Sequence, residues 1–144
     1  MHEVVVGLII DGGREDVWAA LTEPARLAKW FWPWQPSIDF SPSPGAAYAF
    51  EAEHPQAGRL AVDGRVMAVE PGSRLALTWR WTDEPMPPTE VEIRLADADG
   101  ATEVVVRHRR IEQESTAADY EHAWTDILAR LAGYVEGTGA VERD

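Results

Sequence analysis

The amino-acid sequence predicts an α+β fold in which an antiparallel sheet packs against one long C-terminal helix. Between Gly45 and Arg110, apolar residues recur at every second position, which is typical of strands with one buried face. Beyond Ser115 they recur at the spacing of a single helical stripe. A sheet with one apolar face and a helix with one apolar stripe must cover each other.

The N-terminal third of the chain predicts one strand and two short helices. Residues 3–10 form a β-branched apolar run that ends at the Asp-Gly-Gly sequence of positions 11–13, which indicates a strand followed by a turn. Residues 14–30 predict two helices, and Pro24 marks the start of the second because proline is favoured in a first turn. Four prolines within positions 33–44 favour a loop or an irregular sheet edge.

The central region predicts a meander of antiparallel strands. Turn residues at positions 55–58, 71–72, 83–88 and 97–100 separate its segments. In residues 74–81, alternation places four large apolar side chains on one face: Leu75, Leu77, Trp79 and Trp81. The last turn, Asp-Ala-Asp-Gly, predicts a hairpin between the strands on either side.

The last helix is expected to begin at Ser115 or Thr116 and to end near Glu136. Asp126 and Arg130, on the side opposite the apolar stripe, can pair across one turn. We expect one domain over residues 1–137 and a frayed tail over residues 138–144.

Composition and charge exclude several classes of function. The 144 residues carry a net charge of -12, which disfavours partnership with nucleic acid or an anionic membrane. There is no cysteine, and the sequence has no pair of histidines with a carboxylate at the spacing of metal ligands. Neither a metal nor another cofactor is therefore predicted. Because no signal peptide and no apolar run of about 18 residues is present, the expected location is cytoplasmic.

Seven tryptophans suggest an aromatic-lined cavity. The predicted ligand-binding wall consists of six aromatic side chains: Trp30, Trp32, Trp79, Trp81, Tyr120 and Trp124. The sequence leaves open whether Trp32, Trp34 and Trp81 line a cavity mouth or pack at the edge of the core.

His108 is the predicted polar anchor for a ligand. By alternation it shares a face with Val104 and Val106 and points toward the long helix. Burial there disfavours the charged imidazolium and lowers the pKa of His108, so the ring is expected to be neutral at about pH 7. The competing interpretation is a structural histidine with its hydrogen bonds satisfied inside the protein.

Three sequence blocks occur in a characteristic order: IIDGGREDVWAALTEPARLAKWFWP, then GRVMAVEPGSRLALTWRW, then YEHAWTDILARLAGYVEG. With them, residues 5–137 resemble bacterial proteins grouped with the C-terminal domain of the activator of heat-shock chaperone (Hsp90) ATPase, in the START-like (SRPBCC) superfamily. The resemblance implies a helix-grip fold, β-α-α-β(n)-α, in which a curved antiparallel sheet wraps around the C-terminal helix and leaves a cavity between them. The chain departs from the family at residues 107–110, where Arg-His-Arg-Arg replaces a common Thr-His-Ser-Gly.

Relatives in the wider superfamily include lipid carriers, hormone receptors, polyketide cyclases and ring-hydroxylase subunits, so the fold alone does not define a function. We favour a protein that binds an apolar or aromatic small molecule. One alternative is a cyclase or hydrolase that uses His108 and Tyr120 as acid and base. Another is a chaperone-interaction module that presents Trp34. The sequence decides neither the ligand nor whether the protein is an enzyme or a homodimer.

Overall fold

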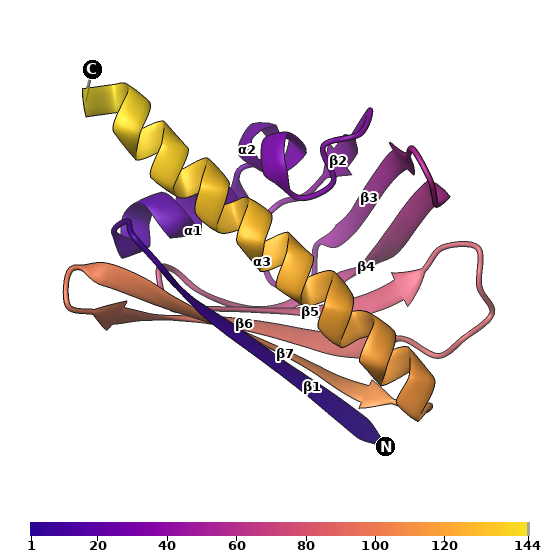
Figure 1. Ribbon diagram of the computed structural model, residues 1–144. Coiled ribbons are helices and arrows are strands. Elements are labelled where there is room, and N and C mark those ends of the chain that lie inside the picture. The colour runs from indigo at the N-terminus through magenta and orange to yellow at the C-terminus, as the bar shows by residue number, and fades with distance from the viewer. Residues whose placement is uncertain (144) are drawn as a thin grey trace.

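The structure, a computed structural model, describes residues 1–143 and the side chains of residues 1–137. One antiparallel sheet curves around a long helix, as the sequence predicts (Figure 1). The elements in chain order are β1 (His2–Ile10), α1 (Arg14–Thr22), α2 (Pro24–Trp30), β2 (Ser37–Asp39), β3 (Ala47–His54), β4 (Gly58–Glu70), β5 (Arg74–Trp81), β6 (Thr89–Ala98), β7 (Ala101–Ile111) and α3 (Glu114–Arg143).

The seven strands lie in the order β1-β7-β6-β5-β4-β3-β2, and all neighbours pair antiparallel. The sheet is therefore a meander that β1 extends by pairing with the last strand. The proline-rich segment supplies only the three-residue β2 at one edge, which agrees with the prediction of an irregular edge. In the β6–β7 hairpin, Asp99 and Gly100 both have positive φ, 51° and 88°, as a two-residue type I′ turn requires.

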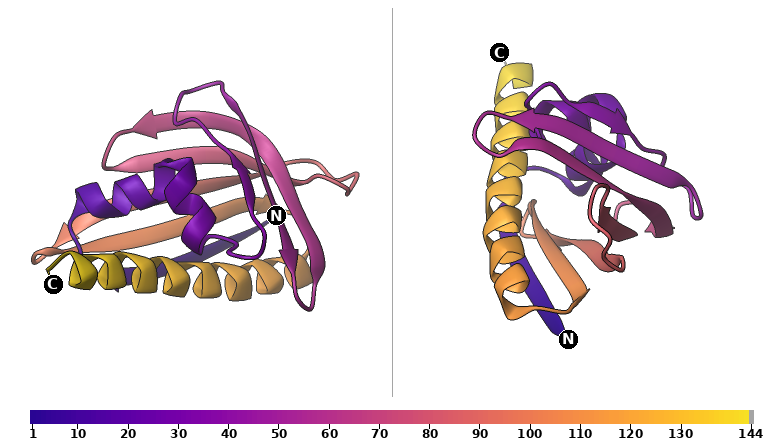
Figure 2. Two further views of the ribbon diagram at one scale, coloured as in Figure 1. Left: turned by 90° about the horizontal axis from the view of Figure 1, so that it is seen from above. Right: turned by 90° about the vertical axis from the view of Figure 1, so that its right-hand side faces the viewer.

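All three helices lie on the concave face of the sheet (Figure 2). α3 crosses the strands, and α1 and α2 lie beside its C-terminal half (Figure 1). The predicted alternation is confirmed, because the inward side chains of β5, β6 and β7 are buried: Leu75, Leu77, Trp79, Val91, Ile93, Leu95, Val104 and Val106. The apolar stripe of α3 covers them, so the sheet and the helix share one core.

Gly12 allows the turn after β1 to approach α3 closely. A Cβ atom at this position would lie 2.6 Å from Cγ1 of Val135, closer than packed atoms approach. The Gly12 carbonyl also accepts a hydrogen bond from Thr102 Oγ1 at 2.7 Å. This glycine therefore serves the packing of β1, β7 and α3.

α3 is longer than predicted. It continues through Gly137 and Gly139 to Arg143, since each glycine inside a helix costs only about 1 kcal/mol. The frayed tail predicted for residues 138–144 stays a prediction, and Asp144 lies outside the described residues.

Arg130 connects α3 to α2 instead of pairing with Asp126. Its Nε donates to the Trp30 carbonyl at 3.1 Å, and a terminal nitrogen donates to the Phe31 carbonyl at 2.9 Å. The guanidinium carbon lies 5.1 Å from the centre of the Trp34 ring. The carbonyls at a helix C-terminus lack partners within the helix, so a positive donor is favoured there. The prediction that Arg130 pairs with Asp126 was therefore wrong, because the guanidinium binds backbone carbonyls of α2 instead.

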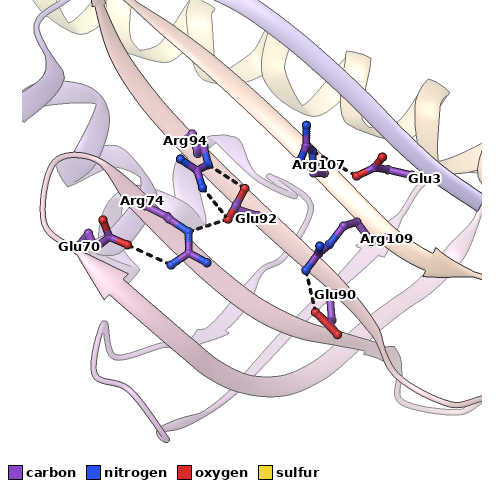
Figure 3. Close-up of polar contacts among 8 residues, drawn as sticks. All are labelled: Glu3, Glu70, Arg74, Glu90, Glu92, Arg94, Arg107 and Arg109. Carbon is purple, nitrogen blue, oxygen red and sulfur yellow. Dashed lines mark hydrogen bonds and ion pairs between the residues drawn. The ribbon is translucent and has the colours of Figure 1, made fainter.

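The outer face of the sheet carries paired charges. Four glutamates and four arginines, spread over five neighbouring strands, contact one another there (Figure 3). Glu92 accepts hydrogen bonds from Arg94 and Arg74, and these two guanidinium groups lower the pKa of Glu92 to about 2 despite its partial burial. Across the eight residues the charges cancel.

Candidate functional site

The space between the middle of α3 and the sheet is filled. Only a void of about 20 Å³ remains, and its lining is almost entirely apolar. Phe31 lies at the centre of this region, with the rings of Trp30, Phe50 and Trp124 at centroid distances of 5.5, 5.2 and 6.3 Å. The cavity expected between helix and sheet is therefore absent at the middle of α3.

A larger cavity of about 350 Å³ opens near the beginning of α3. It lies between the first turns of this helix, the loop at residues 82–88 and the segment at residues 110–113. Its wall includes Trp79, Trp81, Met86, Thr89 and Tyr120. More of the exposed wall surface is apolar than polar, as in small-molecule sites.

Five of the six predicted aromatic wall residues line one or both of these spaces, and Trp79 borders both. Trp79, Trp81 and Tyr120 line the 350 Å³ cavity. Trp30 and Trp124 line only the small void under α3, and the Trp30 indole N–H donates to the Ala20 carbonyl at 2.9 Å. Their contact with a ligand stays a prediction, but only the first three have access to a space that could hold one.

Trp32 supports the cavity wall from behind. Its side chain is buried, and its ring stacks on Trp81 with a centroid distance of 6.0 Å and an interplanar angle of 14°. One face of Trp81 is thus covered by protein. The stack fixes the orientation of a ring that is itself only half-buried.

His108 is fully buried and points toward α3, which confirms the predicted register. The Trp124 indole N–H donates to His108 Nδ1 at 3.0 Å. Because an indole N–H only donates, Nδ1 is the unprotonated nitrogen, and Nε2 carries the proton of the neutral ring. Nε2 donates to Thr89 Oγ1 at 2.6 Å, and Thr89 donates to the Trp79 carbonyl at 3.2 Å.

Burial lowers the pKa of His108 from 6.5 to about 3, so the imidazole is neutral at neutral pH, as expected. Both ring nitrogens are occupied by protein partners, which supports the structural interpretation over the ligand anchor. His108 reaches the cavity only through Thr89, which lies on the wall.

Tyr120 brings a hydroxyl group to the cavity. Its oxygen accepts a hydrogen bond from the Trp81 indole N–H at 2.8 Å. Burial raises the pKa of Tyr120 above its usual value, so the group is a neutral phenol. The ring packs 4.1 Å from the His108 imidazole, centroid to centroid. Tyr120 is therefore the predicted residue that places a polar atom on the wall.

Sequence reasoning missed Thr89, Met86 and Arg110. Arg110 has φ of 66°, in the left-handed region, and the pairing of β1 with β7 shifts register next to it. Because of this bulge, the Ile111 side chain points into the core, and Arg109 and Arg110 both donate hydrogen bonds to the Glu90 carboxylate. The departure at residues 107–110 was the available signal, because a left-handed position normally favours glycine.

Among the described side chains, no three His, Asp or Glu residues form a group that could hold a metal ion. The described helices likewise include none with the length and apolar character needed to cross a membrane.

Residues 12–136 match the family described as "Activator of Hsp90 ATPase homolog 1-like protein". The chain belongs to this family. The match runs from the turn after β1 to Glu136 in α3, and it includes every residue of the cavity wall named above. A search of curated proteins finds no match.

Solved structures share the fold of this family member. DynU16, a protein in the dynemicin biosynthetic locus, is 27% identical with a TM-score of 0.81; the alignment covers 93% of this chain and 47% of that chain, so this chain spans about half of its length. CalU16 from Micromonospora echinospora is 25% identical with a TM-score of 0.72, over 92% of this chain and 75% of that chain. The Aha1 dimer from Colwellia psychrerythraea, 20% identical with a TM-score of 0.76 over 94% and 97%, shows the fold alone.

Proposed function

We propose that this family member binds a small molecule with an apolar or aromatic body in the cavity at the beginning of α3. The observation that carries the proposal is the 350 Å³ cavity with Trp79, Trp81 and Tyr120 on its wall. Its volume falls within the range of small-molecule sites, about 300–1,000 Å³. A structural relative from a biosynthetic locus adds support.

The aromatic wall is rigid before any ligand arrives. Trp81 is held by its stack on Trp32 and by its hydrogen bond to Tyr120. Trp79 packs at 5.5 Å from the Trp124 ring and at 5.9 Å from Trp81, centroid to centroid. A preformed wall avoids the entropy cost of ordering side chains on binding. More of the free energy gained by burying apolar surface therefore appears as binding affinity.

The charges around the cavity disfavour an anionic ligand. Three carboxylates line it, those of Glu84, Glu112 and Asp119, whereas the two lining arginines are already bound to other carboxylates: Arg80 to Asp63 and Arg110 to Glu90. The net charge of -12 opposes the approach of an anion.

A pair of matched helix-surface substitutions tests the proposal. Ala123 and Ala129 are both exposed on α3, but only Ala123 lines the cavity. In titrations with the neutral fluorophore N-phenyl-1-naphthylamine, the wild-type chain should give a saturable rise in emission. Ala123→Phe fills part of the site and should weaken binding about tenfold or more, which corresponds to about 1.4 kcal/mol.

Ala129→Phe adds the same side chain outside the site and should bind like the wild type. Circular dichroism of both variants checks that α3 is intact. The proposal fails if the fluorophore shows no saturable binding, or if both phenylalanine variants bind it as the wild type does.

Two expectations from the sequence remain proposals. We infer a cytoplasmic location, and we propose that the chain can form a homodimer, for which the Colwellia psychrerythraea protein offers a precedent. Sedimentation velocity across a concentration series would measure the dimer directly.

A further inference from the structure

The indole N–H of Trp79 has no hydrogen-bond partner. Its side chain is only 3% exposed, and Nε1 is the one buried side-chain nitrogen or oxygen among the described residues without an acceptor or donor in range. Buried indole N–H groups usually find an acceptor, because an unpaired buried donor has lost its hydrogen bond to water without a replacement. Trp79 lies on the wall of the 350 Å³ cavity, so an occupant of that cavity could supply the acceptor.

A second donor with no acceptor lies beside it. The Tyr120 oxygen accepts from Trp81 Nε1, so the phenolic proton must point away from that indole. Burial raises the pKa of Tyr120, whereas the nearby N–H groups of Trp81 and Trp79 lower it, which places Trp79 Nε1 close to the hydroxyl. The two groups nevertheless make no hydrogen bond of acceptable geometry.

The described protein residues around this point do not satisfy the two donors. Thr89 and His108 are hydrogen-bonded to each other, and the Thr89 hydroxyl donates its hydrogen bond to the Trp79 carbonyl. The Glu84 carboxylate acts on Tyr120 only through its charge, which raises the pKa of the hydroxyl without a hydrogen bond. Trp79 and Tyr120 therefore both line the cavity, and each carries a donor without an acceptor among the described residues.

We propose that Trp79 Nε1–H and Tyr120 O–H form a donor pair that binds an acceptor oxygen of the ligand, and that the ligand is a neutral carbonyl compound: a ketone, quinone or ester on an apolar or aromatic body. This inference rests on the proposed function and names its ligand class. A carbonyl oxygen has two lone pairs and can accept from both donors at once. A neutral carbonyl also avoids the repulsion that an anion would meet.

The donor pair should act as a selectivity filter. An analogue without the oxygen leaves both buried donors unpaired. We therefore expect a preference of about tenfold for a carbonyl compound over the hydrocarbon of the same shape. The donation from Trp81 to the Tyr120 oxygen strengthens the hydroxyl as a donor, because chains of hydrogen bonds polarise one another.

Fluorenone and fluorene provide the test, since they differ mainly by one carbonyl oxygen on the same rigid tricyclic body. Their dissociation constants are measured by displacement of N-phenyl-1-naphthylamine from the full chain. The wild type should bind fluorenone about tenfold more tightly, and Tyr120→Phe should reduce that preference several-fold. Tyr134→Phe removes the same atom from the same helix at a residue that does not line the cavity, and it should keep the wild-type preference.

The infrared carbonyl stretch of bound fluorenone gives a second readout that does not depend on affinity. A hydrogen-bonded carbonyl absorbs at lower frequency than the same compound in an apolar solvent, and we expect this downshift in the wild type and a smaller one in Tyr120→Phe. An unshifted stretch, or equal affinities for fluorenone and fluorene, overturns the inference while leaving the proposed function in place. If neither compound binds, the proposed function fails and the inference fails with it.

Discussion

The two ends of the concave face share strands and a helix, yet one is solid and the other hollow. Toward the C-terminal half of α3, the α2 segment delivers Trp30 and Phe31, and the remaining void is about 20 Å³. At the beginning of α3, the loop at residues 82–88 and the segment at residues 110–113 border a cavity of about 350 Å³. The sheet and α3 thus create the concave space, whereas α2 determines which part of it is filled.

The largest expected difference between the two ends is in stability. Leu128 lies on the solid side and is 2% exposed, so Leu128→Ala should lower the free energy of unfolding by about 2–5 kcal/mol through lost burial and a new void. Met86 lies on the cavity wall and is 41% exposed, so Met86→Ala should change it by only about 0.5 kcal/mol. Urea unfolding of both variants measures the difference. Equal losses would show that the two ends are packed alike.

A second expected effect concerns pH, because His108 lies where the solid core meets the cavity wall. Its pKa is lowered to about 3 in the folded chain, so the unfolded chain binds more protons between about pH 6.5 and pH 3. The stability tied to neutral His108 is complete above about pH 6.5 and is lost as pH falls toward 3. Between about pH 6.5 and 5 the loss should reach about 2 kcal/mol.

Unfolding free energies at several pH values, compared between the wild type and His108→Gln, isolate this contribution. The variant should show a shallower dependence on pH because it lacks the titrating ring. His122→Gln, at an exposed position of α3, serves as the matched control and should follow the wild type. Parallel curves for all three chains would mean that His108 is not buried in the neutral form.

The smallest expected effect is at the bulge beside the cavity. Arg110 has φ of 66°, where glycine is favoured, so Arg110→Gly should stabilise the fold by about 0.5 kcal/mol after the loss of an exposed ion pair with Glu90. Arg109 is not among the residues with positive φ, and Arg109→Gly should instead destabilise by about 0.5–1 kcal/mol. Thermal melting separates the two. A stabilising Arg109→Gly would remove the conformational explanation.

Much of the fold could be predicted because periodicity is a local property of the sequence. Alternation in β5 and β7 placed Trp79 and His108 on the inner face, and the structure confirms both orientations. The helical stripe placed Tyr120 and Trp124 opposite them. A period identifies the buried face of an element, but it carries no information about where along that face the protein is solid.

The candidate site depended on contacts between distant segments. Trp30 fills the core because α2 packs against α3. The contact of Arg130 with α2 likewise could not be predicted from a local pattern. The Thr89 contact of His108 requires the register of β6 against β7, which turn positions alone do not define. The hollow end was therefore identified only once these segments were placed in space.

The cancelled charges on the outer face of the sheet have a consequence for the electrical asymmetry of the molecule. Within the network of four glutamates and four arginines the charges cancel (Figure 3), whereas the described side chains of α3 include one arginine, turned toward α2, and five exposed acidic residues: Glu114, Asp119, Glu121, Asp126 and Glu136. The exposed surface of α3 is therefore more negative than this network of paired charges. On a positively charged support such as an anion-exchange matrix, the molecules should adsorb through α3 and leave the outer face of the sheet turned toward the solution.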